Sequence, residues 1–182
     1  MNLLRGLPAG DNAPEILNAV IEVSSGSRDK YEFNPDWEAF VLDRVIPSSV
    51  VFPIEYGFVP RTLSDDGDPL DVMVMSYEHL EIGCVVKVRV IGALMGHDEK
   101  GEDSKILSVL ANDARFEGWT NITDVHRHKL REIQEFFDTY KRLEQPKWST
   151  FGEWRDSEQA KKIVNHALEK YKQTTGATSS GS

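Results

Sequence analysis

Apolar and polar residues alternate along much of the first 110 residues, a pattern that is typical of β-strands. The clearest example is 84–94, where Cys84, Val86, Val88 and Val90 would share one largely apolar face. Shorter strand-like runs lie at 19–23, 31–33, 39–42 and 71–75. Turn-forming sequences separate these runs at 64–67, 81–83 and 99–101. Many short strands at this spacing predict a barrel or a sandwich.

The last third of the chain has a helical period instead. Apolar residues at 130–143 predict a helix that ends before Pro146. A second apolar stripe at 160–171 predicts another helix, with Asp156 or Ser157 as its N-cap. The fold class is therefore mainly β with flanking helices (α+β), a small β-barrel with two main C-terminal helices packed outside.

Two further segments complete the domain prediction. Trp148 and Trp154 bracket a segment that we interpret as a loop, with its aromatic residues in core or rim packing. The Gly/Ser/Thr-rich residues 174–182 have no apolar anchor, so they are predicted to be a disordered tail. Residues 1–173 are predicted to form a single domain, since 182 residues fit one domain of ordinary size.

Composition narrows the class of protein. The net charge of −9 argues against a nucleic-acid surface, which would be basic. The single cysteine, Cys84, excludes an internal disulfide framework, and no leader or long apolar stretch is evident. These features predict a cytoplasmic protein with neither nucleic acid nor membrane as a partner.

Residues 64–72 contain four aspartates within seven positions, and they lead directly into the apolar strand 71–75. Carboxylates about 4 Å apart repel by roughly 4 kcal/mol at an effective dielectric near 20, so such a cluster favours bound cations. Oxygen ligands favour hard ions such as Mg²⁺, Mn²⁺ or Ca²⁺. A fully solvated acidic turn is the alternative. A calcium EF-hand fits poorly, because the twelfth position from Asp66 is Tyr77 rather than Glu.

A second acidic cluster lies at 97–105. Its glycines have the spacing of a phosphate-binding P-loop, but Glu102 and Asp103 stand where Lys and Ser/Thr are needed, so that match fails. Two acidic turns at strand ends can meet at one barrel mouth. Together they would form a multi-metal site that binds both attacking and leaving oxygens.

These motifs resemble those of a known protein family. The run Asp66-Gly67-Asp68-Pro69-Leu70-Asp71-Val72 is similar to the signature of the soluble family I inorganic pyrophosphatases at every position. An ordered series from about residue 3 to residue 172 carries the same resemblance. Its other members are 21–23, 30–32, 43–44, 56–57, 98–105 and 140–141.

The resemblance implies a closed five-stranded β-barrel of OB type and a role for each matching residue. Asp68 would orient and deprotonate the attacking water, and Tyr56 would lie against that water and its metals. The expected metal-site residues are Asp66, Asp71, Asp98, Asp103, Glu22 and Glu32. The expected phosphate-binding residues are Lys30, Arg44, Lys105, Tyr140 and Lys141.

The activity that the resemblance implies is hydrolysis of pyrophosphate to two orthophosphates. A metal-activated water would attack in line, without a covalent intermediate. Several Mg²⁺ ions per site are expected, with Mn²⁺ or Zn²⁺ as possible substitutes. A homo-oligomer is expected, with a hexamer favoured.

Two other classes remain open from the residues alone. A metal-dependent phosphohydrolase of nucleotides or phosphoesters would need a base-stacking surface, and the site residues offer none. A non-enzymatic OB-type binding module would need basic strands interleaved with exposed aromatics, whereas this chain has aspartates at its strand ends.

Overall fold

The computed structural model describes residues 1–176, and five of its strands close into a ring. The order around the ring is β1-β4-β5-β7-β6, and β6 pairs back with β1. The five strands are β1 (Ile16–Val23), β4 (Glu55–Phe58), β5 (Asp71–Met75), β6 (Val85–Asp98) and β7 (Gly101–Leu110). The closed five-stranded sheet predicted above is thus confirmed, and β5 has the predicted bounds.

The alternation along these strands produces two large core clusters, and a third, small one contains Val20, Phe33 and Phe58. Val72, Val74 and Ile106 belong to a cluster of small aliphatic side chains. Met73 and Leu107, from the same two strands, belong to a second cluster that is rich in aromatic residues. Because successive side chains of a strand point to opposite faces, the strands β1, β5, β6 and β7 each contribute to both large clusters.

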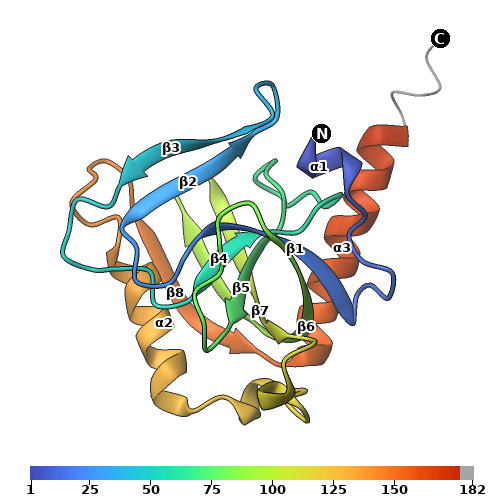
Figure 1. Cartoon of the computed structure of the whole chain (residues 1–182). Helices are drawn as coiled ribbons and strands as arrows, with labels where there is room; N and C mark the ends of the chain where they lie inside the picture. Colours follow the sequence, from blue (N-terminus) through green and yellow to red (C-terminus); the bar gives the residue numbers. More distant parts are fainter. Residues whose placement is uncertain (177–182) are drawn as a thin grey trace.

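A separate two-stranded sheet lies over one side of the ring (Figure 1). It consists of β2 (Asp29–Asn34) and β3 (Ala39–Val45), joined by a short turn. Phe33 packs on Phe58 of the ring, but most of β3 is exposed or half-buried. The hairpin therefore shares little of the core and projects over the ring.

Two long helices pack outside the strands, as predicted (Figure 1). α2 (Arg127–Thr139) buries Ile133, Phe136 and Phe137 in the aromatic cluster. It ends earlier than its apolar stripe suggested, and Leu143 is exposed. Short elements complete this part of the chain: α1 (Leu3–Gly6), η1 (Ala114–Phe116) and η2 (Ile122–Asp124).

α3 (Ser157–Gly176) packs Ala160, Val164 and Ala167 into the aliphatic cluster. Asp156 caps it by accepting a hydrogen bond from the Gln159 amide at 2.9 Å. The helix continues through 174–176, which the sequence analysis assigned to the tail. The rest of the predicted tail, 177–182, lies outside the described residues.

The segment interpreted as a loop is a strand, β8 (Ser149–Arg155). It pairs antiparallel with the end of β6, which at 14 residues extends past the ring. Only Phe151 of β8 is buried, so the strand lacks the apolar alternation by which the others were found. That part of the prediction was wrong.

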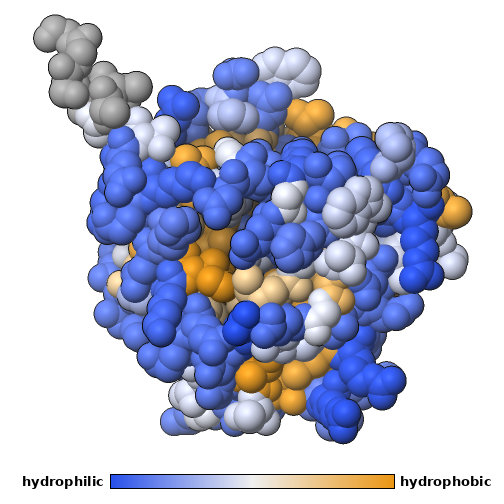
Figure 2. Space-filling model, turned by 180° about the vertical axis from the view of Figure 1, so that it is seen from behind, coloured by the Kyte–Doolittle hydropathy of each residue, from blue (hydrophilic) through white to orange (hydrophobic). Residues whose placement is uncertain are grey.

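Seen from behind, the surface is mostly polar, with apolar side chains gathered in hollows between the polar ones (Figure 2). Within residues 1–176, no helix is both long enough and apolar enough to span a membrane.

Candidate active site

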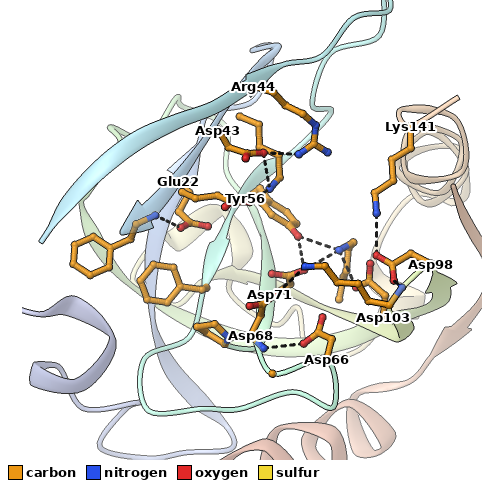
Figure 3. Close-up of a pocket in the computed structure, with 18 of the residues that line it drawn as sticks. Glu22, Asp43, Arg44, Tyr56, Asp66, Asp68, Asp71, Asp98, Asp103 and Lys141 are labelled. Carbon is orange, nitrogen blue, oxygen red and sulfur yellow. Dashed lines mark hydrogen bonds and ion pairs between the residues drawn. The ribbon is translucent and has the colours of Figure 1, made fainter. Parts of the chain in front are cut away.

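A cavity of about 530 Å³ lies between the β2–β3 hairpin, the adjoining strand ends and the turn after α2. Every side chain that the resemblance assigned to the site lines this cavity. They are Glu22, Lys30, Glu32, Arg44, Tyr56, Asp66, Asp68, Asp71, Asp98, Asp103, Lys105, Tyr140 and Lys141. In Figure 3, Asp43 and Arg44 approach from the hairpin, and the other labelled aspartates lie below them: Asp66, Asp68, Asp71, Asp98 and Asp103.

The base of the cavity is built by the parallel pairing of β5 and β7, which places Asp71 opposite Lys105. Asp103 is two residues before Lys105, so both side chains point to the same face of the sheet. Lys105 Nζ donates to Asp71 at 2.8 Å, to Asp103 at 3.0 Å and to the Tyr56 hydroxyl at 3.0 Å. The Tyr56 hydroxyl in turn donates to Asp71 at 2.5 Å.

This face is the one that carries the aromatic cluster. Lys105 is only 2% exposed, and its ammonium lies 5.0–5.5 Å from the ring centroids of Tyr56, Phe137 and Phe151. Burial by itself lowers the pKa of Lys105, but the charges of Asp71 and Asp103 outweigh it and raise that pKa above its ordinary value. A fixed positive charge therefore lies between two carboxylates at the cavity floor.

The acidic turn before β5 supplies Asp66 and Asp68. Gly67 has φ +91°, a conformation that suits glycine, and the Asp68 amide donates to the Asp66 carboxylate at 3.0 Å. Burial raises the pKa of Asp66, and the charges of Asp68, Asp71 and Asp103 raise it further. A divalent cation would relieve this repulsion.

Asp98 comes from the end of β6, and Lys141 comes from the turn after α2. Lys141 Nζ donates to Asp98 at 2.9 Å (Figure 3). Burial by itself raises the pKa of Asp98, but hydrogen bonds from Lys141 and from the Lys100 amide outweigh it and lower that pKa. Asp98 therefore stays ionised beside a cation.

The hairpin supplies the opposite wall. Lys30 forms an ion pair with Glu32 and lies 3.9 Å from Asp43, and Arg44 Nη1 donates to Asp43 at 2.5 Å. All of these side chains belong to strands β2 and β3, which pair with each other and not with the ring.

Glu22 joins the hairpin to the ring strand β1. Its carboxylate accepts a hydrogen bond from the Phe33 amide of β2 at 2.8 Å. Burial raises the pKa of Glu22 to about 8, although this hydrogen bond acts in the opposite direction.

Four charged side chains line the cavity without having been assigned to the site from sequence: Asp43, Glu99, Lys100 and Lys147. Lys100 lies 3.3 Å from Asp68. The first three stand inside or beside motifs that were recognised, so proximity was a usable signal for them. Lys147 follows Pro146 in a turn where no pattern marked it.

The donor set of the cavity fits hard divalent cations. Its carboxylates offer oxygen atoms from strand ends and turns, and nine acidic side chains outnumber six basic ones among those that line it. Among residues 1–176, no three His, Cys, Asp or Glu side chains already group tightly enough to hold an ion. Ammonium groups lie between the carboxylates instead, as Lys105 does between Asp71 and Asp103.

Comparisons with known proteins agree with one another. A family model described as "Inorganic pyrophosphatase" matches residues 19–172. The inorganic pyrophosphatase of Thermus thermophilus is 47% identical over 171 residues, which cover 93% of this chain and 98% of that protein. Its crystal structure gives a TM-score of 0.92 over 94% of this chain and 99% of that one. A Helicobacter pylori inorganic pyrophosphatase gives 0.88 at 36% identity, over 92% and 99% of the two chains.

Proposed function

Since this chain belongs to the inorganic pyrophosphatase family and hydrolyses pyrophosphate to phosphate, we propose that the reaction takes place in the cavity below the hairpin. The observation that carries the proposal is the β5–β7 register, which brings Asp71, Asp103 and Lys105 into contact on one face. Asp66 and Asp98 line the same cavity.

Asp66, Asp71, Asp98 and Asp103 are the proposed ligands of several Mg²⁺ ions, with Glu22 and Glu32 supporting the ions and their water. When bound, divalent ions would offset the excess of carboxylates, screen the charge of pyrophosphate and lower the pKa of a coordinated water. Mn²⁺ or Zn²⁺ are possible substitutes for Mg²⁺.

Asp68 is the proposed proton acceptor. It stands on the turn between two proposed ligands, and its side chain is 60% exposed to the cavity and solvent. A water held beside it can give up a proton as it attacks phosphorus. Tyr56, which is hydrogen-bonded to Asp71 and Lys105, would hold this region of the site in place.

The cations around the cavity are the proposed phosphate-binding groups. Lys105 and Lys141 reach it from the ring and from the turn after α2, while Lys30 and Arg44 reach it from the hairpin. Tyr140 adds a hydroxyl beside Lys141. Charges placed on both sides of the cavity suit a substrate with two phosphoryl groups, because one group must be attacked while the other leaves. The proposed displacement is in line and needs no covalent intermediate.

A phosphate-release assay tests this proposal. The enzyme is given pyrophosphate or ATP, with Mg²⁺, Mn²⁺ or Zn²⁺, and with or without a chelator. We expect release from pyrophosphate in Mg²⁺, little from ATP, and none with the chelator. Equal release from ATP would favour the nucleotide phosphohydrolase class, and release that persists in the chelator would contradict the metal site.

We also propose that the chain forms a homo-oligomer, with a hexamer favoured. Several large apolar side chains are exposed, including Trp37, Leu42, Val45, Val51 and Tyr77, which is consistent with a surface that copies of the chain cover. Light scattering coupled to size exclusion would give the mass, and a monomer would contradict this proposal. A cytoplasmic location stays a prediction.

A further inference from the structure

Glu144 contacts Arg44, one of the proposed phosphate-binding residues. It lies in the turn after α2, between the cavity residues Lys141 and Lys147, but it is not among the side chains that line the cavity. Its carboxylate forms an ion pair with Arg44 Nε. The Glu144 side chain is only 10% exposed, and that of Arg44 is 19% exposed. The contact therefore connects the hairpin to the body of the protein in a largely buried position.

Two carboxylates fix the guanidinium of Arg44 on different edges. Asp43 accepts from Nη1 at 2.5 Å, and Glu144 contacts Nε. Because a guanidinium is planar and its donors are in a fixed fork, these two contacts define the direction of the third nitrogen, Nη2. Nη2 is then the atom left for a ligand in the cavity that Arg44 lines.

The arrangement is costly for a contact that would serve stability alone. Glu144 Oε2 is buried and has no hydrogen-bond partner among residues 1–176, and the contact with Nε is an ion pair without good hydrogen-bond alignment. Leaving a buried carboxylate oxygen unsatisfied costs free energy, and such groups in a native structure need an explanation. A requirement to hold Arg44 at the cavity wall provides one.

We infer that Glu144 is a positioning residue, which orients the Arg44 guanidinium so that Nη2 meets a phosphoryl oxygen of pyrophosphate. This inference rests on the proposed function of Arg44. Glu144 acts through Arg44 and does not touch the substrate. Its loss would therefore weaken substrate binding more than the chemical step, because the groups proposed to bind metal and accept the proton are elsewhere in the cavity.

Steady-state kinetics on pyrophosphate at saturating Mg²⁺ test the inference, with Glu144→Ala and Glu144→Gln. Glu144→Ala should raise KM about 5- to 10-fold and change kcat by less than about twofold, as expected when a bound arginine loses one orienting partner. Glu144→Gln should raise KM less, because its carbonyl oxygen keeps a partial negative charge beside Nε at the place of the carboxylate. Glu153→Ala and Glu153→Gln are the matched controls, since Glu153 is exposed and its ion-pair partner within residues 1–176 is Arg155, on the same strand β8.

A double-mutant cycle with Arg44→Lys separates positioning from a general structural role. In the Arg44→Lys background, Glu144→Ala should add less than about a twofold change in KM, because lysine has no Nε for Glu144 to orient. An undiminished effect in that background, or a fall in kcat with KM unchanged, would overturn the inference. The inference would also be overturned if Glu144→Ala leaves KM unchanged while Arg44→Lys raises it.

A different result would show that the proposed substrate-binding role of Arg44 is itself wrong. If Arg44→Lys alone leaves KM at the parental value, Arg44 does not bind the substrate, and both the role of Arg44 and the inference are wrong. Glu144→Gln keeps the size of the side chain, so it remains a test if Glu144→Ala folds poorly.

Discussion

The ring strands and the β2–β3 hairpin both contribute to the cavity, but they hold their side chains in different ways. On the ring, Asp71, Asp103 and Lys105 are joined by hydrogen bonds over a packed aromatic cluster. On the hairpin, Lys30 pairs with Glu32 and Arg44 with Asp43 in the same two-stranded sheet, and Glu144 is the partner of Arg44 outside it. Two strands alone are marginally stable, so the hairpin depends on a few contacts with the body for its position.

This contrast indicates that metal binding and phosphate binding place different demands on the structure. Close carboxylates that bind metal must be held rigidly, because they repel one another and the ion requires a defined geometry. Groups that bind the outer phosphate can be carried by an element with fewer core contacts. Substitutions of the aspartates on the ring and in the turn before β5 should therefore affect turnover and the metal requirement, and substitutions of the hairpin cations Lys30 and Arg44 should affect KM.

The largest effect is expected on the ring side, at Asp68. Asp68→Asn should lower kcat by about 100-fold or more, since a positioned general base contributes about 10²–10⁴ in rate. The Mg²⁺ requirement should change little, because Asp68 is not among the proposed ligands. Phosphate release at varied Mg²⁺ measures both kcat and the Mg²⁺ requirement. Asp11→Asn is the control, because Asp11 is exposed and does not line the cavity. Turnover close to the parental value would remove the proton-acceptor role.

Asp71→Asn tests the metal site on the rigid strand. The Mg²⁺ concentration that gives half-maximal activity should rise roughly 10-fold or more, in line with the loss of a ligand or its support. The pyrophosphate KM measured at saturating Mg²⁺ should move less. An Mg²⁺ titration that coincides with that of the parent enzyme would take Asp71 off the ligand set.

Lys30→Ala tests the hairpin half of the contrast. Its side chain is 15% exposed and lines the cavity, so we expect KM to rise about 10-fold, as for the loss of a charge-assisted hydrogen bond. The Mg²⁺ requirement should stay near its parental value, and Lys87→Ala on the exposed part of β6 is the control. A raised Mg²⁺ requirement with unchanged KM would contradict the proposal that Lys30 on the hairpin binds substrate and leaves metal binding to the aspartates.

The smallest effect is expected at Lys100. Its ion pair with Asp68 joins two side chains that are each 60% exposed, and such pairs contribute little. Lys100→Ala should change kcat and KM by no more than about twofold. A loss as large as that of Asp68→Asn would instead assign Lys100 a part in the chemical step.

Much of the ring was predictable because its strands alternate and its turns contain glycine and aspartate. Residues 71–75 were predicted with their observed bounds, and Asp156 was one of the two predicted caps of α3. β8 was missed because it is an edge strand with a single buried side chain, Phe151, and its pairing depends on the length of β6. No local pattern carries that information.

The site residues also fall into two groups. Some were found from a local sequence motif, and others are linked only by a contact in the folded chain. The family signature identified Asp66, Asp68 and Asp71, and all of them line the cavity. The contact of Arg44 with Glu144 joins residues that are distant in sequence, and neither a motif nor a period connects them. Pairs of this kind become visible only when the hairpin and the turn after α2 are placed together.

The most direct test of the account is a crystal structure of the protein soaked in Mn²⁺, with anomalous scattering recorded at the manganese edge. The account predicts anomalous peaks in the cavity, within ligand distance of carboxylate oxygens of Asp66, Asp71 and Asp103. Peaks elsewhere on the protein, with none among these aspartates at saturating Mn²⁺, would contradict it.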